Sequence, residues 1–286
     1  MKHTKKMSIR KIKRNIKILL FLAGLMTAGV KVKEYLPYII PSSTTTEATA
    51  PAAIPTSIEH LKKYLPDDNL NRPEQLLYRK NYIVSYNSQT KCPNLVLWEL
   101  TREHADGNVK RPEYAFHEDM EVPAPRAELT DYKGSGYDRG HMCPAGDNKW
   151  DKDAMYESFL MTNMCPQNRN LNAGLWNQIE MQCRIWAKKY GRLYIICGPI
   201  FLKGKHQTIG QNNVMVPEAF FKVIVKLDST PRGIAFVCKN TDGNKKKDCY
   251  VNTISQVERI TGYSFFPNLD KNITLLIKEN ANIENW

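Results

Sequence analysis

Residues Lys133–Met142 read KGSGYDRGHM, and Asp138, Arg139 and His141 place a carboxylate, a guanidinium and an imidazole within four positions. A histidine can take a proton from water near neutral pH, and an arginine can hold a phosphate through two parallel hydrogen bonds. Glycines at three nearby positions allow the backbone to bend. This combination favours phosphodiester hydrolysis over a structural turn, provided that the rest of the chain supplies a metal site and further positive charge.

Residues 171–190, LNAGLWNQIEMQCRIWAKKY, form the clearest predicted helix, and a glycine follows them. The apolar stripe of this helix is made of Leu175, Ile179, Cys183 and Trp186. Glu180 and Arg184 lie one turn apart on the flank of the stripe, and Asn172 lies at the helix entrance. Taken alone, Glu180 and Arg184 would be a surface ion pair and Asn172 a helix cap. Together with the motif at residues 138–141, all three become candidate site residues.

Three apolar runs rich in β-branched residues predict strands, at residues 192–202, 219–228 and 233–239. Residues 252–262 predict a further helix, with apolar residues at helical spacing and a final glycine. The chain lacks the regular strand–helix alternation of a dinucleotide-binding domain, and it has no Gly-rich nucleotide motif. We therefore expect strands interleaved with helices in a different arrangement.

The N-terminal residues have the composition of a leader. Residues 2–17 carry eight Lys or Arg residues and no acidic residue, and an apolar run follows at residues 18–30. This run has the length of a signal-peptide core and is short for a membrane span of about 20 residues, but no clear cleavage site follows. Residues 1–40 are therefore interpreted as a signal peptide or an N-terminal membrane anchor. Residues 41–57 predict a disordered linker, and residues 58–286 are long enough for one domain.

The net charge gives only weak support for a nucleic-acid partner. The chain has a formal net charge of +12, from 41 basic and 29 acidic residues. Residues 1–50 hold ten of the basic and two of the acidic residues, which leaves 31 basic against 27 acidic, or +4, for the rest. A mildly basic domain does not by itself predict binding to a polyanion, so the positions of individual arginines must carry that argument.

The seven cysteines are an odd number, so at least one thiol is free or pairs between chains. If the domain is exported, Cys238 and Cys249 are the expected disulfide, because they flank the hairpin-turn pair Asp242-Gly243. No pair of cysteines or histidines has the spacing of a zinc site.

With these residues in view, the domain resembles the DNA/RNA non-specific endonuclease family, which includes endonuclease G and secreted bacterial nucleases. The resemblance covers about residues 78–270. Its matching blocks are Tyr137–Met142, Asn163–Gln167, Leu171–Asn177, Gln178–Glu180, Arg184, Cys197–Pro199 and Val216–Lys222. The resemblance implies an α+β fold with a central, mostly antiparallel sheet flanked by helices. It also implies an active site in a ββα-metal motif, which is the motif also called a His-Me finger.

The resemblance also implies roles for the matching residues. His141 would be the general base that deprotonates the attacking water. Asn172 would be the one direct protein ligand of a divalent ion, and Glu180 would hold a water bound to that ion. Arg139 and Arg184 would neutralise the charge that develops on the phosphate. The implied cofactor is Mg²⁺, with Mn²⁺ as an alternative ion, and a hydrated Mg²⁺ is compatible with a single amide oxygen as ligand.

Three further residues have supporting roles by the same resemblance. Asp138 would position the motif backbone and the metal-bound waters. Asn163 would support the network of those waters. Arg111, upstream of the motif, is the best counterpart of a phosphate-contacting arginine in the family, although the spacing in that region varies.

The implied activity is Mg²⁺-dependent endonucleolytic cleavage of DNA and RNA with little sequence preference, which leaves 5′-phosphate and 3′-hydroxyl ends. A non-catalytic nucleic-acid-binding or uptake protein and a phosphodiesterase for other phosphate esters are the alternatives. The leader favours a bacterial envelope or secreted enzyme, membrane-anchored if the leader is uncleaved, with the mitochondrial intermembrane space as the alternative. Because dimers are common in the family, a homodimer is a further expectation.

Overall fold

The computed structural model describes residues 55, 57–113, 115–242 and 245–286. The predicted leader, residues 1–40, and most of the predicted linker at 41–57 lie outside the described residues. None of the helices within the described part is long and apolar enough to span a membrane.

The centre of the described residues is a seven-stranded antiparallel sheet with the order β12-β11-β10-β7-β4-β3-β2. In chain order its strands are β2 (Gln75–Tyr78), β3 (Tyr82–Asn87), β4 (Cys92–Thr101), β7 (Arg192–Ile200), β10 (Ala219–Lys226), β11 (Arg232–Lys239) and β12 (Val251–Asn252). The central strands β4, β7 and β10 are buried along almost their whole length, because protein covers both faces of the sheet. Strands in such a position form continuous apolar runs rather than alternating ones.

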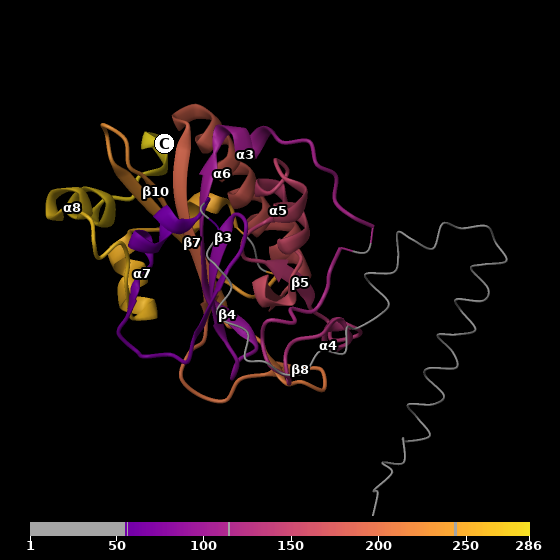
Figure 1. Ribbon diagram of the computed structural model, residues 1–286. Coiled ribbons are helices and arrows are strands. Elements are labelled where there is room, and N and C mark those ends of the chain that lie inside the picture. The colour runs from indigo at the N-terminus through magenta and orange to yellow at the C-terminus, as the bar shows by residue number, and fades with distance from the viewer. Residues whose placement is uncertain (1–54, 56, 114, 243–244) are drawn as a thin grey trace, which may run out of the picture. The chain divides into compact units, whose positions relative to one another are not determined.

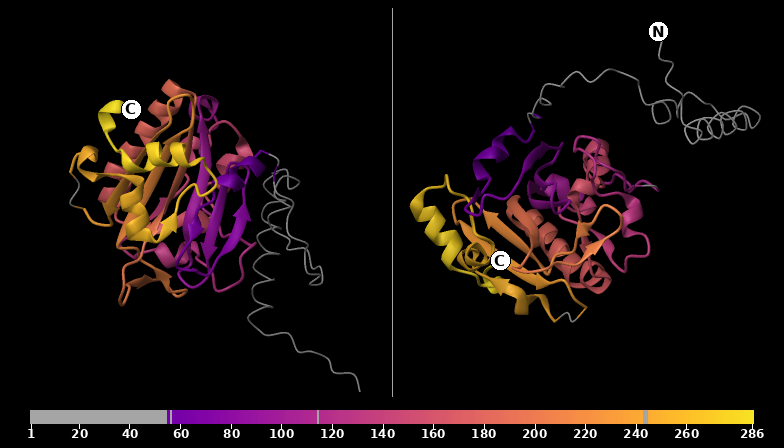
Figure 2. Two further views of the ribbon diagram at one scale, coloured as in Figure 1. Left: turned by 90° about the vertical axis from the view of Figure 1, so that its left-hand side faces the viewer. Right: turned by 90° about the horizontal axis from the view of Figure 1, so that it is seen from below.

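Two layers of helices cover the two faces of the sheet (Figures 1 and 2). One layer holds α3 (Arg102–Asp106), α4 (Leu129–Tyr132), α5 (Lys152–Glu157), the π-helical turn η5 (Leu171–Trp176) and α6 (Asn177–Tyr190). The opposite layer holds the 3-10 helix η2 (Glu59–Tyr64), α7 (Ile254–Thr261) and α8 (Lys271–Glu279). The two layers pack on separate hydrophobic cores, and α5 packs on a smaller cluster with Ala115 and Phe159. The site described below belongs to the layer of α6.

A separate two-stranded antiparallel sheet on the α6 side carries the DRGH motif. It pairs β5 (Asp138–His141) with β6 (Met164–Gln167), and the chain then runs into η5 and α6. Gly140 allows this pairing, since a Cβ atom at that position would lie 2.3 Å from the Gln167 side chain. The α+β class and the ββα arrangement that the resemblance implied are thereby confirmed.

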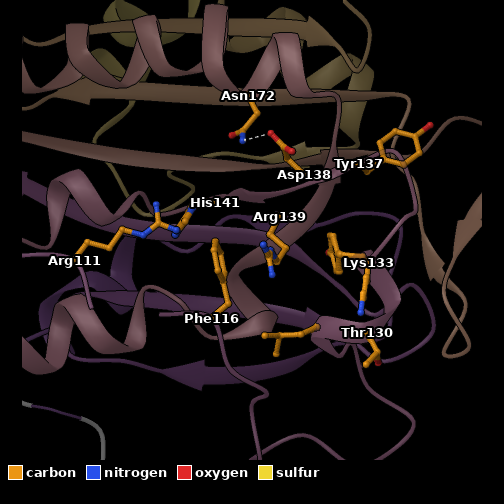
Figure 3. A pocket seen from close by; sticks show the side chains of 11 residues that line it. Arg111, Phe116, Thr130, Lys133, Tyr137, Asp138, Arg139, His141 and Asn172 are labelled. Carbon is orange, nitrogen blue, oxygen red and sulfur yellow. Dashed lines mark hydrogen bonds between the residues drawn. The ribbon is translucent and has the colours of Figure 1, made fainter. Parts of the chain in front are cut away.

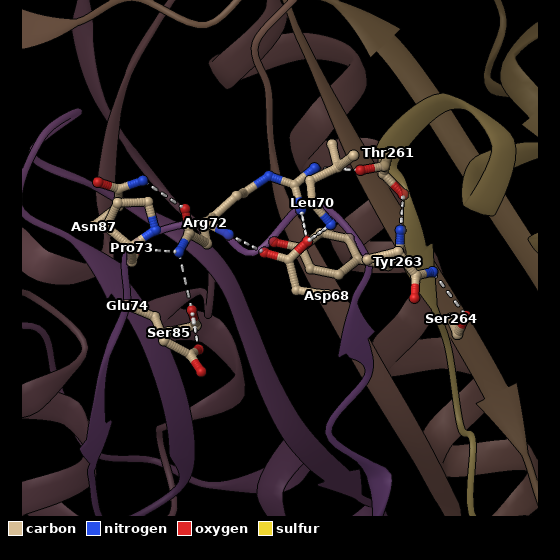
Figure 4. A network of polar contacts seen from close by, with 12 residues as sticks. Asp68, Leu70, Arg72, Pro73, Glu74, Ser85, Asn87, Thr261, Tyr263 and Ser264 are labelled. Atoms are coloured by element: carbon tan, nitrogen blue, oxygen red, sulfur yellow. Dashed lines mark hydrogen bonds and ion pairs between the residues drawn. The ribbon is translucent and has the colours of Figure 1, made fainter.

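Short elements complete the fold. They are the strand pairs β1 (Asp67–Asp68) with β13 (Tyr263–Ser264) and β8 (Thr208–Ile209) with β9 (Val214–Met215), and the 3-10 turns η3 (Ala145–Asp147), η4 (Met161–Asn163), η6 (Lys247–Tyr250) and η7 (Ile283–Asn285). Arg72 ties the β1 region to the C-terminal part, as Figure 4 shows. Its guanidinium contacts the Asp68 carboxylate and the Thr261 carbonyl, and it lies 4.4 Å from the Tyr263 ring centre.

The elements predicted from the sequence occur close to their predicted bounds. The helix predicted at 171–190 is present as η5 followed by α6, and it ends where Gly191 adopts a φ of 87°. The strands predicted at 192–202, 219–228 and 233–239 correspond to β7, β10 and β11. The helix predicted at 252–262 is α7, which begins with a capping box between Thr253 and Gln256.

The predicted disulfide between Cys238 and Cys249 is wrong, because all seven cysteines of the described residues are free. Cys238 lies on β11 opposite Phe220, fully buried in the core on the α6 side. Cys249 lies in η6 and is exposed.

Candidate active site

A cavity of about 520 Å³ opens beside the DRGH motif (Figure 3). Its lining residues are Arg111, Phe116, Leu129, Thr130, Tyr132, Lys133, Tyr137, Asp138, Arg139, His141 and Asn172. Five of the residues singled out from the sequence therefore meet in one cavity. They come from a loop, from β5 and from η5, which are far apart along the chain.

His141 lies at the end of β5, with its ring between two phenylalanines. The ring centre lies 4.9 Å from that of Phe159 and 5.5 Å from that of Phe116. Its Nε2 atom makes no hydrogen bond to any described residue. Burial lowers the pKa of His141 to about 3, and the positive charges of Arg111 and Arg139 act in the same direction. The imidazole is therefore neutral at physiological pH, which is the form that can accept a proton.

Arg111 and Arg139 are held beside His141 by the same two phenylalanines. The Arg139 guanidinium lies 4.2 Å from the Phe116 ring centre, and the Arg111 guanidinium lies 4.7 Å from that of Phe159. Neither arginine forms an ion pair with a carboxylate in the described residues. Burial lowers the pKa of Arg111, with a further contribution from Arg139. Two unpaired guanidiniums at one cavity are a binding site for an anion such as phosphate.

Asn172 faces these groups from the π-helical turn η5. Its Nδ2 donates a hydrogen bond of 3.0 Å to Oδ2 of Asp138 (Figure 3). A carboxylate can only accept, so Asp138 fixes which end of the amide faces it and leaves the Asn172 carbonyl oxygen for another partner. No group of three or more His, Cys, Asp or Glu side chains in the described residues could hold a metal ion. The donors present fit a hydrated ion such as Mg²⁺ on one amide oxygen, and they do not fit a carboxylate cage or a zinc site.

Arg184 takes a partner that the sequence does not suggest. Its Nη1 donates a 2.8 Å hydrogen bond to Oδ1 of Asp147, which is fully buried, and Trp98 Nε1 donates a 3.1 Å bond to the other carboxylate oxygen. The surface ion pair between Glu180 and Arg184 that helical spacing allows is absent among the described residues. Glu180 and Arg184 lie on the first turns of α6 and do not line the cavity of Figure 3.

Glu180 is held close to half-ionised near neutral pH. Burial raises the pKa of Glu180 to about 7, Asp147 adds to the rise, and the positive charges of Lys222 and Arg184 oppose it. Small changes in the surrounding charge will therefore decide whether Glu180 is a carboxylate or a carboxylic acid.

Asn163 holds the chain that follows His141. Its Oδ1 accepts a 2.9 Å bond from the Cys143 amide, and its Nδ2 donates bonds of 2.8 Å to the carbonyls of Cys143 and Ser158. The side chain is fully buried. Asn163 thus supports the site through the backbone, and it does not contact the solvent in which metal-bound waters would lie.

Replacing Asn163 with alanine would leave the Cys143 amide and two buried carbonyls without partners. We expect the free energy of unfolding to fall by about 3 kcal/mol. Urea unfolding followed by far-UV circular dichroism measures this, with replacement of the exposed Asn170 by alanine as the matched control. Equal stability of Asn163→Ala and the control would contradict the role.

The effect of Arg111 on His141 can be measured directly. Replacing Arg111 with alanine removes the larger of the two charge effects that lower the pKa of His141, so this pKa should rise by about 1 unit. An NMR titration of the histidine ring resonances measures the change. Lys110→Ala is the control, since it removes a neighbouring charge that is not among the causes of the shift. An unchanged His141 pKa in Arg111→Ala would show that Arg111 does not act on the ring.

A family model described as DNA/RNA non-specific endonuclease matches residues 65–272. The chain belongs to this family. The family residues thus include the whole of the cavity, the ββα motif and all seven strands of the main sheet. The resemblance drawn from the DRGH motif and the blocks around it is confirmed.

Named relatives and one solved structure agree with the family. The chain is 35% identical over 207 residues to the mitochondrial nuclease EXOG of Xenopus laevis, a match that covers 67% of this chain and 58% of that protein. It is 33% identical over 223 residues to a nuclease of a Nostoc species, covering 73% of this chain and 80% of the relative. The fold also matches a chain in the crystal structure of an EndoG/EndoGI complex, with a TM-score of 0.71, 29% identity and coverage of 80% of this chain and 99% of that chain.

Several residues of the endonuclease site were not predicted from the sequence. Phe116 and Phe159 enclose His141, and Trp176 on η5 donates a 3.2 Å bond from Nε1 to the His141 carbonyl. Asp147 anchors Arg184. Phe116 and Phe159 carry no sequence signal, since they meet His141 only after folding. Trp176 belongs to the same family block as Asn172, and this was the one feature of the sequence that could have marked it as a site residue.

Proposed function

We propose that this protein is a Mg²⁺-dependent endonuclease that cleaves DNA and RNA with little sequence preference and leaves 5′-phosphate and 3′-hydroxyl ends. The observation that carries the proposal is a neutral His141 lining the cavity beside two guanidiniums that have no carboxylate partner. Family membership supports the same conclusion. No base-reading element is evident in the cavity lining, which fits recognition of phosphate and sugar rather than sequence.

In the proposed reaction, a water oxygen attacks the phosphorus atom while the His141 imidazole accepts the water proton. The bond from phosphorus to the 3′ oxygen then breaks, and that oxygen is released as a hydroxyl after taking a proton from solvent. Arg139 and Arg111 hold the non-bridging oxygens and stabilise the negative charge that develops on them. The neutral form of His141 is the form that can accept this proton.

Asn172 would hold Mg²⁺ through its carbonyl oxygen, and Asp138 would fix the orientation of the Asn172 amide. The ion would supply Lewis-acid stabilisation of the leaving oxygen. Asp138 is free to contact ion-bound water through its other oxygen, and Glu180 would hold such a water from α6. Arg184 would provide further positive charge near the scissile phosphate while its guanidinium stays bound to Asp147.

A plasmid-nicking assay tests the proposed function. Supercoiled DNA should be nicked and RNA degraded with Mg²⁺ or Mn²⁺, with no cleavage in EDTA, and a DNA ligase should reseal the nicks, since ligation requires 5′-phosphate and 3′-hydroxyl ends. Retention of DNA without cleavage would favour a binding protein instead. Cleavage of small or lipid phosphodiesters in preference to nucleic acid would favour a different phosphodiesterase.

We also propose export of the enzyme, on the basis of the basic and apolar composition of residues 2–30. The Xenopus relative is named as mitochondrial, which keeps import into mitochondria as the alternative. A fusion of residues 1–57 to alkaline phosphatase, which is active only after export, distinguishes the two in a bacterial host. Recovery of the fusion from the membrane fraction would indicate an uncleaved anchor. A separate measurement, light scattering of the purified domain, tests the expected homodimer.

A further inference from the structure

A lysine side chain is buried beneath the site without a hydrogen bond. Lys222 lies in the middle of β10, opposite Cys197 of β7 and Phe236 of β11, and it is fully buried. Its Nζ atom makes no hydrogen bond to any described residue. Burying an ammonium group is costly unless nearby groups compensate for the lost water. The groups around Lys222 therefore explain its presence.

Two tryptophan rings provide part of that compensation. The Lys222 ammonium lies 4.4 Å from the ring centre of Trp176 and 5.1 Å from that of Trp98, both within the range of cation–π attraction. Each tryptophan also holds one part of the site. Trp176 Nε1 donates to the His141 carbonyl, and Trp98 Nε1 donates to Asp147, which binds Arg184. Lys222 thus contacts the two tryptophans that hold the His141 backbone and Asp147, the carboxylate partner of Arg184.

Ionisable groups near Lys222 provide the rest of the compensation for burying its ammonium group. The titratable groups that act on Lys222 are Cys197 on β7, Glu180 and Cys183 on α6, and Asp147 on η3. Burial raises the pKa of both thiols to about 12, so they are neutral at physiological pH. Burial opposes the ammonium form of Lys222, and the carboxylates of Glu180 and Asp147 favour it.

Asp147 already has Arg184 and Trp98 as partners, whereas Glu180 has no hydrogen bond or ion pair in the described residues. The charged groups that act on Glu180 are Lys222, Asp147 and Arg184. Of its two cationic neighbours, Arg184 is bound to Asp147, which leaves Lys222 as the cation without a carboxylate partner of its own.

We propose that Lys222 is a positioning residue for the nuclease reaction, which fixes the two tryptophans that support His141 and Asp147 and favours the carboxylate form of Glu180. This inference rests on the proposed function, since it concerns the same site. Lys222 is fully buried and does not line the cavity, so we expect its effect to pass through Glu180, Trp98 and Trp176.

The test compares pH–rate profiles of plasmid nicking for wild type, Lys222→Met and Lys222→Arg. Methionine keeps most of the side-chain volume without the charge, so the acid limb should move upward by about one pH unit and the rate at pH 7 should fall about fivefold. Arginine restores the charge and should return the acid limb to its wild-type position.

Lys226→Met is the matched control. Lys226 lies on the same strand, is also buried and lies 4.8 Å from the Tyr190 ring centre, but its ammonium pairs with Asp228. Its removal should change stability without moving the acid limb. If Lys222→Met and Lys226→Met give the same profile as wild type, the inference is overturned while the proposed function stands. An inactive wild type would instead overturn the proposed function.

A stability cycle gives a second readout that needs no activity. Urea midpoints are measured for Lys222→Met, Glu180→Gln and the double variant. Each single change leaves one charge buried without its counter-charge, so the double variant should lose less than the sum of the two single losses. Should Lys222→Met fail to fold, the double variant is expected to recover folded protein. Strictly additive losses, or a double variant as unfolded as the single one, would overturn the inference.

Discussion

Replacing His141 with alanine is expected to lower the rate of plasmid nicking by about a thousandfold at pH 7 while the protein stays folded. The neutral His141 ring lines the cavity, and a positioned general base contributes a factor of about 10² to 10⁴. Loss of the ring should not unfold the domain, because β5 keeps its backbone pairing with β6 and the Trp176 bond goes to the His141 backbone. Single-turnover cleavage with saturating Mg²⁺ measures the effect.

His60→Ala is the control for that experiment, since His60 pairs with Glu99 and does not line the cavity. It should cleave at the wild-type rate. Circular dichroism and the urea midpoint establish that His141→Ala is folded. A folded His141→Ala protein with near wild-type cleavage would disprove the proposed role of the imidazole.

Replacing Asn172 with alanine should have the second-largest effect. It removes the one amide oxygen that faces the cavity from η5, and it frees Asp138 from its only bond to this side chain. We expect the affinity for Mg²⁺ to fall by about a hundredfold and the cleavage rate at limiting Mg²⁺ to fall in proportion. Isothermal titration calorimetry measures the affinity for Mg²⁺. Nicking assays at a series of Mg²⁺ concentrations measure the cleavage rate at limiting Mg²⁺.

Asn170→Ala serves as the control, because it changes an exposed asparagine two residues earlier in the same turn region. Partial recovery of activity at high Mg²⁺ in Asn172→Ala would fit a loss of metal affinity. Undiminished Mg²⁺ binding by Asn172→Ala would show that the ion is held elsewhere.

The elements that could be predicted are those with strong local signals. β7, β10 and β11 are long apolar runs, and α6 and α7 end at glycines with positive φ. The strands β2, β3 and β4 were not predicted. β3 has only six residues, all buried, and such a short run has no periodicity that separates strand from helix. The π-helical form of η5 could not be predicted from the sequence either, because it depends on packing at the site rather than on helix propensity.

The site was predictable where function restricts the residue type. His141, Arg139, Asp138, Asn172 and Arg111 were identified from the motif and the family blocks, and they do meet in one cavity. Their supports were not. Asp147 precedes Arg184 by 37 positions. Arg184 pairs with Asp147 rather than with Glu180 because folding buries Asp147 beside it, and residue spacing cannot predict that burial. Lys222 stands in a matched block, but its function depends on the two tryptophans that surround it.

The cysteines have a practical consequence for studying the enzyme. Of the seven thiols in the described residues, six are buried and only Cys249 is exposed. A maleimide dye added to the folded protein should therefore attach at one place, in η6, without any engineered substitution. A fluorophore at Cys249 could then report binding of a labelled oligonucleotide by energy transfer in EDTA, where cleavage is stopped and the association step is observed alone.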